Sequence, residues 1–549
     1  MKTSSVLRHL LLFGAGAAVL LSGCARRENP VAIGNREQIL HLGNLSEPKE
    51  LDPHVVTGVT EFNILSALLE GLVAEDPQDL HPIPGAAEGW TVSEDGCQYT
   101  FRLRRDGKWS NGAPVTASDW IFSFKRILSP KLGSPYAYML FGLTNAEAFH
   151  LGKIDDFSLV GAKAADDHTL VLTLHAPVPY FLPILAHHSW FPVHPATVLS
   201  AGAIDQIGAK WTQPGRFVGN GPFVLKAWEP QSRITVVKSD TYWDRDRVRL
   251  KEIDFHPIGD HQTEENAFRA GQLHVTGSVP IDRIEHYRKT APERLRLSPY
   301  LGTYYYLLNA KVPPLNDPRV RRALALGIDR EQLVRRVSKA GEDPAWNFTP
   351  PGTGGYTARA RLQGDVEAAR KLLAEAGFPE GKGFPRLKLL YNTSEGHERI
   401  AQAIQQMWKT RLGVDIELVN MEWKVYLAQT QEGKYEMARA GWIADYSDPA
   451  TFLNLWVTDG GNNRTGWSNK DYDRLMAEAD AARAPQERLE IFQKAEEILM
   501  NEVPIIPVYF YRSKALIQPS VKGWLPNLLD HHPYKYVYLE AESAKQGRF

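Results

Sequence analysis

The sequence lacks an excess of charge of either sign. Its 549 residues carry 63 Lys and Arg against 64 Asp and Glu, a formal net charge of -1. A nucleic-acid-binding protein normally carries a basic excess, and a protein held on a membrane surface by charge carries a polybasic patch. The balance argues against both classes. A content of 43% hydrophobic and 23% charged residues instead indicates a globular chain of several domains.

Cysteine is equally scarce, because Cys24 and Cys97 are the only two in the chain. Two cysteines exclude a cysteine-rich zinc site. A chain of this length can also build its core without disulfides. We expect Cys97 to be a small buried apolar side chain and not a nucleophile.

Familiar catalytic and nucleotide-binding motifs are missing as well. The chain has no G-x-S-x-G, H-E-x-x-H, P-loop or G-x-G-x-x-G pattern. The best metal candidate is the group His187, His188 and His194, and these three are interpreted as ordinary packed or surface histidines, as is the pair His531 and His532. We therefore expect no catalytic residues, no metal and no cofactor.

The one long apolar run lies at the N-terminus. Lys2 and Arg8 precede an apolar and small-residue stretch over 10–21, shorter than the about 20 residues that span a bilayer. Small residues and then Cys24 follow, which predicts a signal peptide over 1–23. This end resembles a bacterial lipoprotein signal, in which Cys24 would be acylated; a plain signal peptide with a coincidental cysteine is the alternative. We expect an exported protein, anchored by lipid on the periplasmic side of the cell envelope.

Strand-like and helix-like patterns follow each other along the rest of the chain. Period-two alternation predicts strands over 39–42, 99–103, 170–174, 234–236 and 414–418. An apolar period of 3.6 residues predicts helices over 319–326, 366–376, 398–412 and 477–500. The chain is therefore predicted to be mixed α/β.

A set of short segments spread over nearly the whole chain is more specific. The segments include Leu51-Asp52-Pro53-His54, Lys108-Trp109-Ser110-Asn111-Gly112, Ser134-Pro135-Tyr136-Ala137, Asn220-Gly221-Pro222-Phe223, Tyr242-Trp243-Asp244, Asn316-Asp317-Pro318-Arg319, Ala374-Glu375-Ala376-Gly377-Phe378 and Gly441-Trp442-Ile443-Ala444-Asp445. Each segment is weak alone, but together, and in this order, they resemble the oligopeptide-binding lipoproteins of bacterial ABC importers, which are extracytoplasmic solute-binding proteins of family 5.

The resemblance implies a periplasmic-binding-protein-like α/β fold with two main α/β lobes plus an extra third domain. Lobe I is expected over 25–69, 197–301 and 534–549, lobe II over 70–196 and lobe III over 302–533. Two crossings link lobes I and III, and the ligand is expected in the cleft between them. Such a hinge suits a protein that closes on its cargo.

The resemblance also assigns the residues that meet the two ends of a peptide. A peptide ammonium needs a buried carboxylate, and the matching residue is Asp445; its alternative role is that of an aspartate in a turn. Arg439 and His397 match residues that meet the peptide carboxylate, which an arginine can bind with two hydrogen bonds. A surface arginine and a solvated histidine are the alternatives.

Five further residues match the walls of the cleft. Tyr136, Trp423, Trp442 and Asn462 match lining side chains, and Val59 matches a main-chain contact to the ligand. The alternatives are core aromatics, a loop asparagine and simple burial.

The chain departs from the family pattern at two pairs of positions. The best-known members carry a cysteine pair where this chain has Gly302 and Ile443. The loss of both cysteines together supports the match, because the loss of one alone would leave a free thiol. Two further basic partners of the carboxylate appear here as Val312 and Thr430. Fewer cations along the cleft narrow the expected ligands to short peptides of about two to five residues.

The expected function is that of a non-enzymatic, monomeric binding protein. It would capture short peptides by their free amino terminus and backbone and deliver them to an ABC permease in the cytoplasmic membrane. The same fold binding murein peptides, a nickel chelate or haem is the first alternative. A hydrolase or signalling enzyme on this scaffold is the second.

Overall fold

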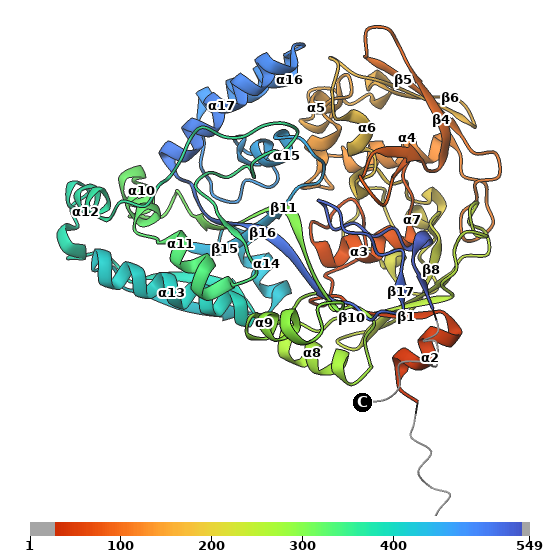
Figure 1. The fold of residues 1–549 in the computed structure, drawn as a ribbon. Coiled ribbons are helices and arrows are strands. Elements are labelled where there is room, and N and C mark those ends of the chain that lie inside the picture. Colours follow the sequence, from red (N-terminus) through yellow and green to blue (C-terminus); the bar gives the residue numbers. More distant parts are fainter. Residues whose placement is uncertain (1–27, 541–549) are drawn as a thin grey trace, which may run out of the picture.

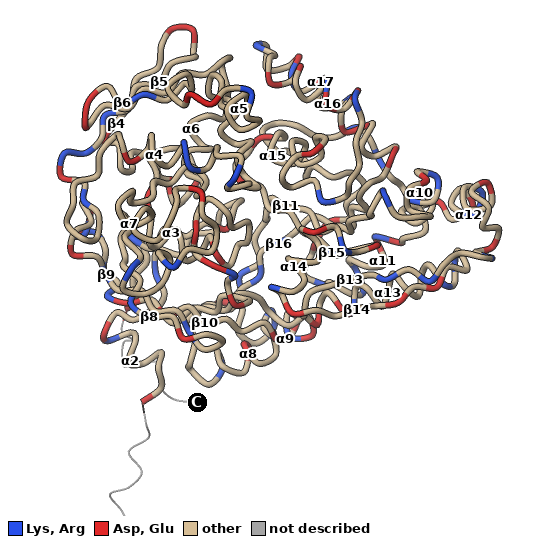
Figure 2. The backbone as a smooth tube through the Cα atoms, turned by 180° about the vertical axis from the view of Figure 1, so that it is seen from behind, with Lys and Arg blue, Asp and Glu red and all other residues tan. Residues whose placement is uncertain are grey.

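A computed structural model describes residues 28–540 of the chain (Figure 1). The predicted signal peptide over 1–23, the acylated Cys24 and the last nine residues of predicted lobe I lie outside the described residues. Within 28–540, no helix combines the length and the apolar character that crossing a membrane requires. Lysines and arginines are interspersed with acidic residues along the chain (Figure 2), as the charge balance indicates.

Three larger sheets organise the described chain, and we call the parts around them lobes I, II and III. The sheet of lobe I has the order β1-β10-β9-β8, with β1 parallel to β10 and the other pairs antiparallel. Its strands are β1 (Ile39–Gly43), β8 (Phe223–Glu229), β9 (Arg233–Lys238) and β10 (Glu252–His256). Its helices are α2 (Pro30–Glu37), α3 (Val59–Leu68), α8 (His261–Arg269) and α9 (Ile281–Thr290), and β17 (Val521–Lys522) and β18 (Tyr538–Leu539) lie beside it.

Lobe II is built on an antiparallel sheet of order β4-β5-β7-β6. The strands are β4 (Ala87–Val92), β5 (Gln98–Leu103), β6 (Ala162–Asp166) and β7 (Thr169–Thr173). The helices are α4 (Ala117–Ile127), α5 (Ala146–His150), α6 (Phe181–Ile184) and α7 (Pro195–Ala201), and the small hairpin of β2 (Val73–Glu75) and β3 (Pro82–Pro84) precedes the sheet.

Lobe III contains a mixed six-stranded sheet of order β12-β16-β11-β15-β13-β14. The strands are β11 (Leu295–Leu308), β12 (Asp343–Pro344), β13 (Leu387–Asn392), β14 (Ile416–Met421), β15 (Met437–Ile443) and β16 (Ile505–Leu516). The helices are α10 (Pro318–Leu326), α11 (Arg330–Leu333), α12 (Val366–Glu375), α13 (Glu395–Leu412), α14 (Trp423–Gln431), α15 (Ala450–Leu453), α16 (Lys470–Ala481) and α17 (Pro485–Glu502).

Two long strands carry the chain between lobes I and III. β11 and β16 are antiparallel partners from the pair Leu295 and Leu516 to the pair Leu307 and Ile505. In Figure 1 both run from the sheet of lobe I into the sheet of lobe III. The chain therefore passes between these two lobes through a paired two-strand ribbon. The lobe boundaries given above remain a prediction.

Most of the predicted strands and helices are present, and one predicted helix is wrong. The stretch over 477–500 is not one helix, because α16 ends at Ala481 and α17 begins at Pro485. Proline lacks the N–H of a helical ladder and disfavours a helical backbone in the residue before it. Ala484 accordingly has φ -88° and ψ 121°, which is extended.

The expectation that Cys97 is buried is also wrong. This cysteine is partly exposed, and its thiol donates to the carbonyl of Asp95 at 3.5 Å. It sits in the turn before β5, where the chain lies at the surface and not in the core.

Candidate ligand-binding site

A cavity of about 440 Å³ lies between lobes I and III. Lobe I contributes the end of β1 and the start of α3, and lobe III contributes β15, β16 and the start of α13. Lobe II closes one side with Tyr136, His187 and His188. The wall of the cavity therefore comes from chain segments that lie hundreds of residues apart in the sequence.

Asp445 is a nearly buried carboxylate at one end of this cavity. It follows β15 by two residues, and its side chain is 9% exposed. Tyr136 Oη and Thr451 Oγ1 donate to it at 3.4 Å each. Among the described residues no Lys or Arg nitrogen lies within 4.0 Å of it. Burial raises the pKa of Asp445 to about 7.

His187 does not supply the missing positive charge. Its Nε2 lies 3.3 Å from Asp445 Oδ1. Burial, followed by the nearby His531, lowers the pKa of His187 to about 3. The imidazole is therefore neutral near pH 7, and this contact is not an ion pair. Tyr136, Thr451 and His187, the side chains that contact the Asp445 carboxylate, are neutral.

Arg439 lies on β15, before Asp445 in the sequence, and presents the opposite charge to the cavity. Its Nη2 donates to Tyr511 Oη at 2.6 Å and its Nη1 to Asn392 Oδ1 at 3.3 Å. The guanidinium stacks over the Tyr304 ring at 4.7 Å from the centroid, and its buried Nε has no partner. No carboxylate within the described chain lies within 4.0 Å. Arg439 is therefore a fixed cation without a counter-ion in the described part of the chain.

His397 lies beside Arg439 on the first turn of α13. Its Nδ1 is 3.4 Å from Tyr304 Oη. Burial, and then the charge of Arg439, holds the pKa of His397 well below its usual range. A neutral imidazole can still donate one hydrogen bond to an anion that reaches Arg439.

The edge of β15 connects these two charges. β11 pairs with β15 along its whole length, but β13 pairs with it only at Met437 and Ala438. Beyond that point, the second edge of β15 has no partner strand in the part of the chain that the structure describes, and residues 439 and 441–445 line the cavity. The six residue-to-residue steps from Arg439 to Asp445 correspond to about 20 Å of extended chain at roughly 3.3 Å per residue.

Seven of the eight predicted ligand-binding residues line this one cavity. They are Asp445, Arg439, His397, Tyr136, Trp423, Trp442 and Val59. Val59, the first residue of α3, is 40% exposed, so simple burial does not explain it. The eighth, Asn462, is not part of the wall: its Nδ2 donates to the carbonyl of Pro135 at 3.3 Å and so supports the segment that carries Tyr136. Their contacts with a ligand stay predictions.

The two positions where the best-known family members carry cysteines lie side by side on neighbouring strands of this chain. Gly302 of β11 lies directly opposite Ile443 of β15. A Cβ atom at Gly302 would meet Ile443 Cδ1 at 2.5 Å. The isoleucine therefore fills the space beside the glycine, and the two replacements complement each other. The other two substituted positions, Val312 and Thr430, do not line the cavity.

Several residues of the wall are not predicted by the sequence. The cavity is also lined by His187, His188 and His531, which the sequence presents as ordinary histidines, and by Tyr511. Local sequence gives no signal for them, because their place depends on how lobe II and the C-terminal segment pack against the cleft. His194 points elsewhere and caps α7 through Thr197.

Comparisons with known proteins identify the family. The model of the bacterial extracellular solute-binding proteins, family 5 Middle, matches residues 81–464. The periplasmic oligopeptide-binding protein OppA of Escherichia coli is 39% identical over 95% of this chain and 96% of its own length. The structure of Haemophilus influenzae OppA in complex with the peptide RPPGFSPFR has a TM-score of 0.86 at 33% identity, covering 92% of this chain and 99% of that chain.

A third relative is known in two forms. The structure of the Escherichia coli murein tripeptide binding protein MppA has a TM-score of 0.87 at 37% identity, covering 92% of this chain and 98% of that chain. Its unliganded open form gives only 0.61 at 36% identity, with 92% and 97% covered. The periplasmic-binding-protein-like fold is thereby confirmed. This chain belongs to the bacterial extracellular solute-binding proteins of family 5.

Proposed function

We propose that this protein is the substrate-binding component of an ABC importer and that it captures short peptides. One observation carries the proposal: a nearly buried carboxylate and a fixed guanidinium, neither with a counter-ion among residues 28–540, flank an open strand edge in one cavity. A free peptide in extended form has the complementary pattern of one ammonium, one carboxylate and a row of amide groups between them.

Charge pairing supplies the anchors at the two peptide ends. A buried charge without a partner is unfavourable, so Asp445 gains most from a ligand that brings a positive charge. A peptide ammonium at Asp445 places the chain antiparallel to β15. Its carboxylate then runs toward Arg439, which has a free Nε donor.

The strand edge supplies affinity that does not depend on peptide sequence. An extended peptide can add to an open sheet edge through main-chain hydrogen bonds. Peptide side chains would then project alternately to the two sides of the added strand. Trp423, Trp442 and Tyr136 offer broad apolar contacts there, and water can fill the space that a small side chain leaves.

Closure of the cleft would hold the captured peptide. The ribbon of β11 and β16 connects lobes I and III and can act as a hinge. The lower TM-score of the unliganded open form of MppA supports such a movement in the family, because the other MppA structure fits this chain better at equal coverage of this chain.

The cellular setting follows the family and the N-terminal pattern. Periplasmic relatives place the protein outside the cytoplasm. We propose further that acylated Cys24 anchors it to a membrane and that it works as a monomer, without catalysis, with an ABC permease in the cytoplasmic membrane. Mass spectrometry of the lipid fraction released from Cys24-containing peptides tests the anchor.

A murein peptide is the second candidate ligand. The similarity to MppA favours it. Its free amine and carboxylates would suit the same two anchors. A nickel chelate or haem offers no ammonium for Asp445 and fits this charge pattern less well.

Two measurements test the proposal. Mass spectrometry of the ligand that co-purifies with the protein identifies its class and length. Calorimetry with one tripeptide in four forms, with each end free or blocked, then tests the two anchors. We expect tight binding only when both ends are free; equal affinity for all four forms would contradict the proposed recognition.

A further inference from the structure

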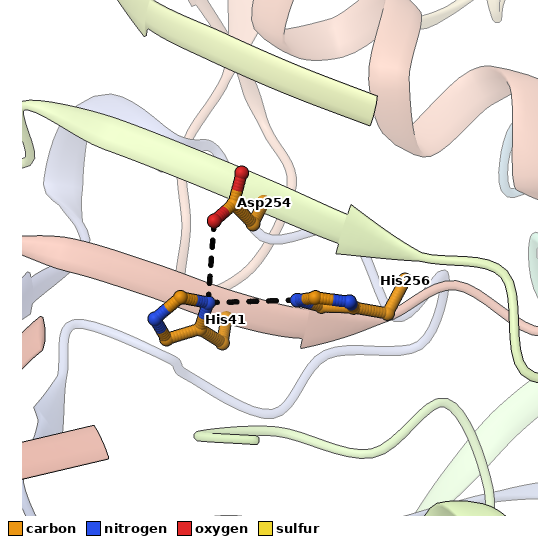
Figure 3. A group of neighbouring side chains, drawn as sticks. All are labelled: His41, Asp254 and His256. Atoms are coloured by element: carbon orange, nitrogen blue, oxygen red, sulfur yellow. Dashed lines mark hydrogen bonds and ion pairs between the residues drawn. The ribbon is translucent and has the colours of Figure 1, made fainter. Parts of the chain in front are cut away.

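A cluster of two histidines and one aspartate lies on the sheet of lobe I, outside the cavity (Figure 3). His41 of β1 lies opposite Asp254 of β10 in the parallel register, and His256 follows Asp254 by two residues on the same strand. Cross-strand partners and residues two apart share a face of a sheet. The register therefore gathers all three side chains on one face.

The distances from His41 Nδ1 to the other two ligand atoms match the edges of a coordination tetrahedron. His41 Nδ1 lies 3.4 Å from Asp254 Oδ2 and 3.5 Å from His256 Nε2. All three donors lie within 4.8 Å of one another. In a tetrahedral zinc site with bonds of about 2.0–2.1 Å, neighbouring ligand atoms are about 3.3–3.4 Å apart. An ion could enter with little rearrangement of the ligands.

The surroundings hold the donors in place. Thr235 Oγ1 donates to Asp254 Oδ1 at 2.5 Å, which leaves Oδ2 directed toward His41. The ring of His274 stacks on that of His41, with centroids 5.6 Å apart and planes at 9°. A hydrogen bond to a ligating carboxylate is typical of the groups that support metal sites.

A simple hydrogen-bonded pair explains the cluster less well. His41 Nδ1 faces both a carboxylate oxygen and an imidazole nitrogen, and one Nδ1 hydrogen can satisfy only one of them. A cation at the centre would instead be bound by all three ligand atoms through their lone pairs. Arg233 Nη1 lies 3.8 Å from Asp254 Oδ2, but this side chain is 45% exposed and also pairs with Glu229, so it can turn away.

We propose that His41, Asp254 and His256 bind one divalent transition-metal ion of the zinc class. Two imidazoles and one carboxylate suit such ions, whereas calcium and magnesium prefer oxygen ligands alone. Water or an external ligand takes the fourth position. The ion ties β1 to β10, so it stabilises the first strand of lobe I without entering the peptide cleft.

A second group offers a matched control. Asp76, Asp79 and His81 also lie within reach of one another, but His81 and Asp79 are exposed in a turn and hydrogen bond to each other at 2.6 Å. The variant His81→Gln therefore removes an imidazole near carboxylates without touching the proposed site.

The test titrates Zn²⁺ by calorimetry and Co²⁺ by visible absorption into peptide-free, metal-depleted protein. We expect one ion per chain and the strong visible bands of tetrahedral Co²⁺. His41→Gln and His256→Gln should each weaken binding by about 100-fold or more, because losing even a supporting group costs 10- to 100-fold. His81→Gln should bind as the wild type does.

Thermal unfolding gives a second readout, since an ion that binds the folded state raises the melting temperature. Zn²⁺ should raise it in the wild type and in His81→Gln but not in His41→Gln. Saturation with peptide should leave the metal titration unchanged. The proposal is overturned if no stoichiometric binding occurs, if both glutamine variants at positions 41 and 256 bind as the wild type, or if peptide blocks the ion.

Discussion

At the scale of single residues, recognition depends on two charges that have no counter-ion within 4.0 Å among the described residues. The carboxylate of Asp445 accepts hydrogen bonds from hydroxyl groups, and Arg439 contacts hydroxyl, amide and aromatic groups. Such an arrangement is unfavourable in the empty protein. The unpaired charges lower the stability of the empty protein. A ligand that supplies the missing counter-charges removes this cost, and binding is more favourable by that amount.

This argument predicts that removing the charge of Asp445 stabilises the peptide-free protein. Burial raises its pKa from 3.8 to about 7, so ionisation in the unfolded chain precedes ionisation in the folded chain as the pH rises. Folding stability is therefore lost between those values, on the order of a few kcal/mol at pH 8. Asp445→Asn should raise the melting temperature at pH 8 and leave it nearly unchanged below pH 4.

Asp459→Asn is the control for that experiment, because Asp459 is exposed and its backbone conformation at φ 57° accepts asparagine. Thermal unfolding of peptide-free samples at several pH values measures the effect. If Asp445→Asn is less stable than the wild type at pH 8, the carboxylate is already paired in the empty protein.

At the scale of elements, the open edge of β15 should hydrogen bond to the main chain of the peptide and not to its side chains. Only alternate residues of an added strand point their N–H groups toward β15. N-methylation at those positions leaves a buried acceptor unpaired and should cost about 1–3 kcal/mol, or roughly 5- to 150-fold in affinity. N-methylation at the intervening positions should have little effect.

Calorimetry with a series of singly N-methylated tetrapeptides measures this pattern. The intervening positions are the internal control, since they carry the same added methyl group. A uniform loss at every position would point to a purely steric effect and would argue against strand addition.

Most of the helices and strands that the sequence pattern predicts are present in the structure. Alternation predicted β1, β5, β7 and β9, and an apolar period predicted α10, α12 and α13. The pattern over 477–500 concealed the break before Pro485, because the apolar period continues on both sides of it. The cluster of His41, Asp254 and His256 was invisible for another reason: only the register of β1 on β10 brings position 41 to positions 254 and 256.

The candidate site was predictable only through the family resemblance. Local sequence around Asp445 is typical of a turn, and nothing near it indicates burial or a missing counter-ion. Matching segments placed seven residues in the observed cavity. They could not place His187 or His531, whose position depends on the packing of lobe II and of the C-terminal segment.

At the scale of the whole molecule, the two-strand ribbon between lobes I and III should allow the cleft to close. We expect the radius of gyration in small-angle X-ray scattering to fall when a peptide with both ends free is added. A peptide blocked at both ends, matched in sequence, should leave the scattering unchanged. Identical scattering with and without a bound peptide would show that the lobes do not move.

The pairing of Asp445 with a peptide amine is tested most directly by calorimetry of the wild type and Asp445→Ala with one tripeptide and its N-acetylated form. The wild type should bind the free peptide about 10²–10³-fold more tightly than the acetylated one, from about 3–5 kcal/mol for a buried charge left unpaired. Asp445→Ala should bind both forms equally weakly. Wild-type affinity of Asp445→Ala for the free peptide would contradict the pairing.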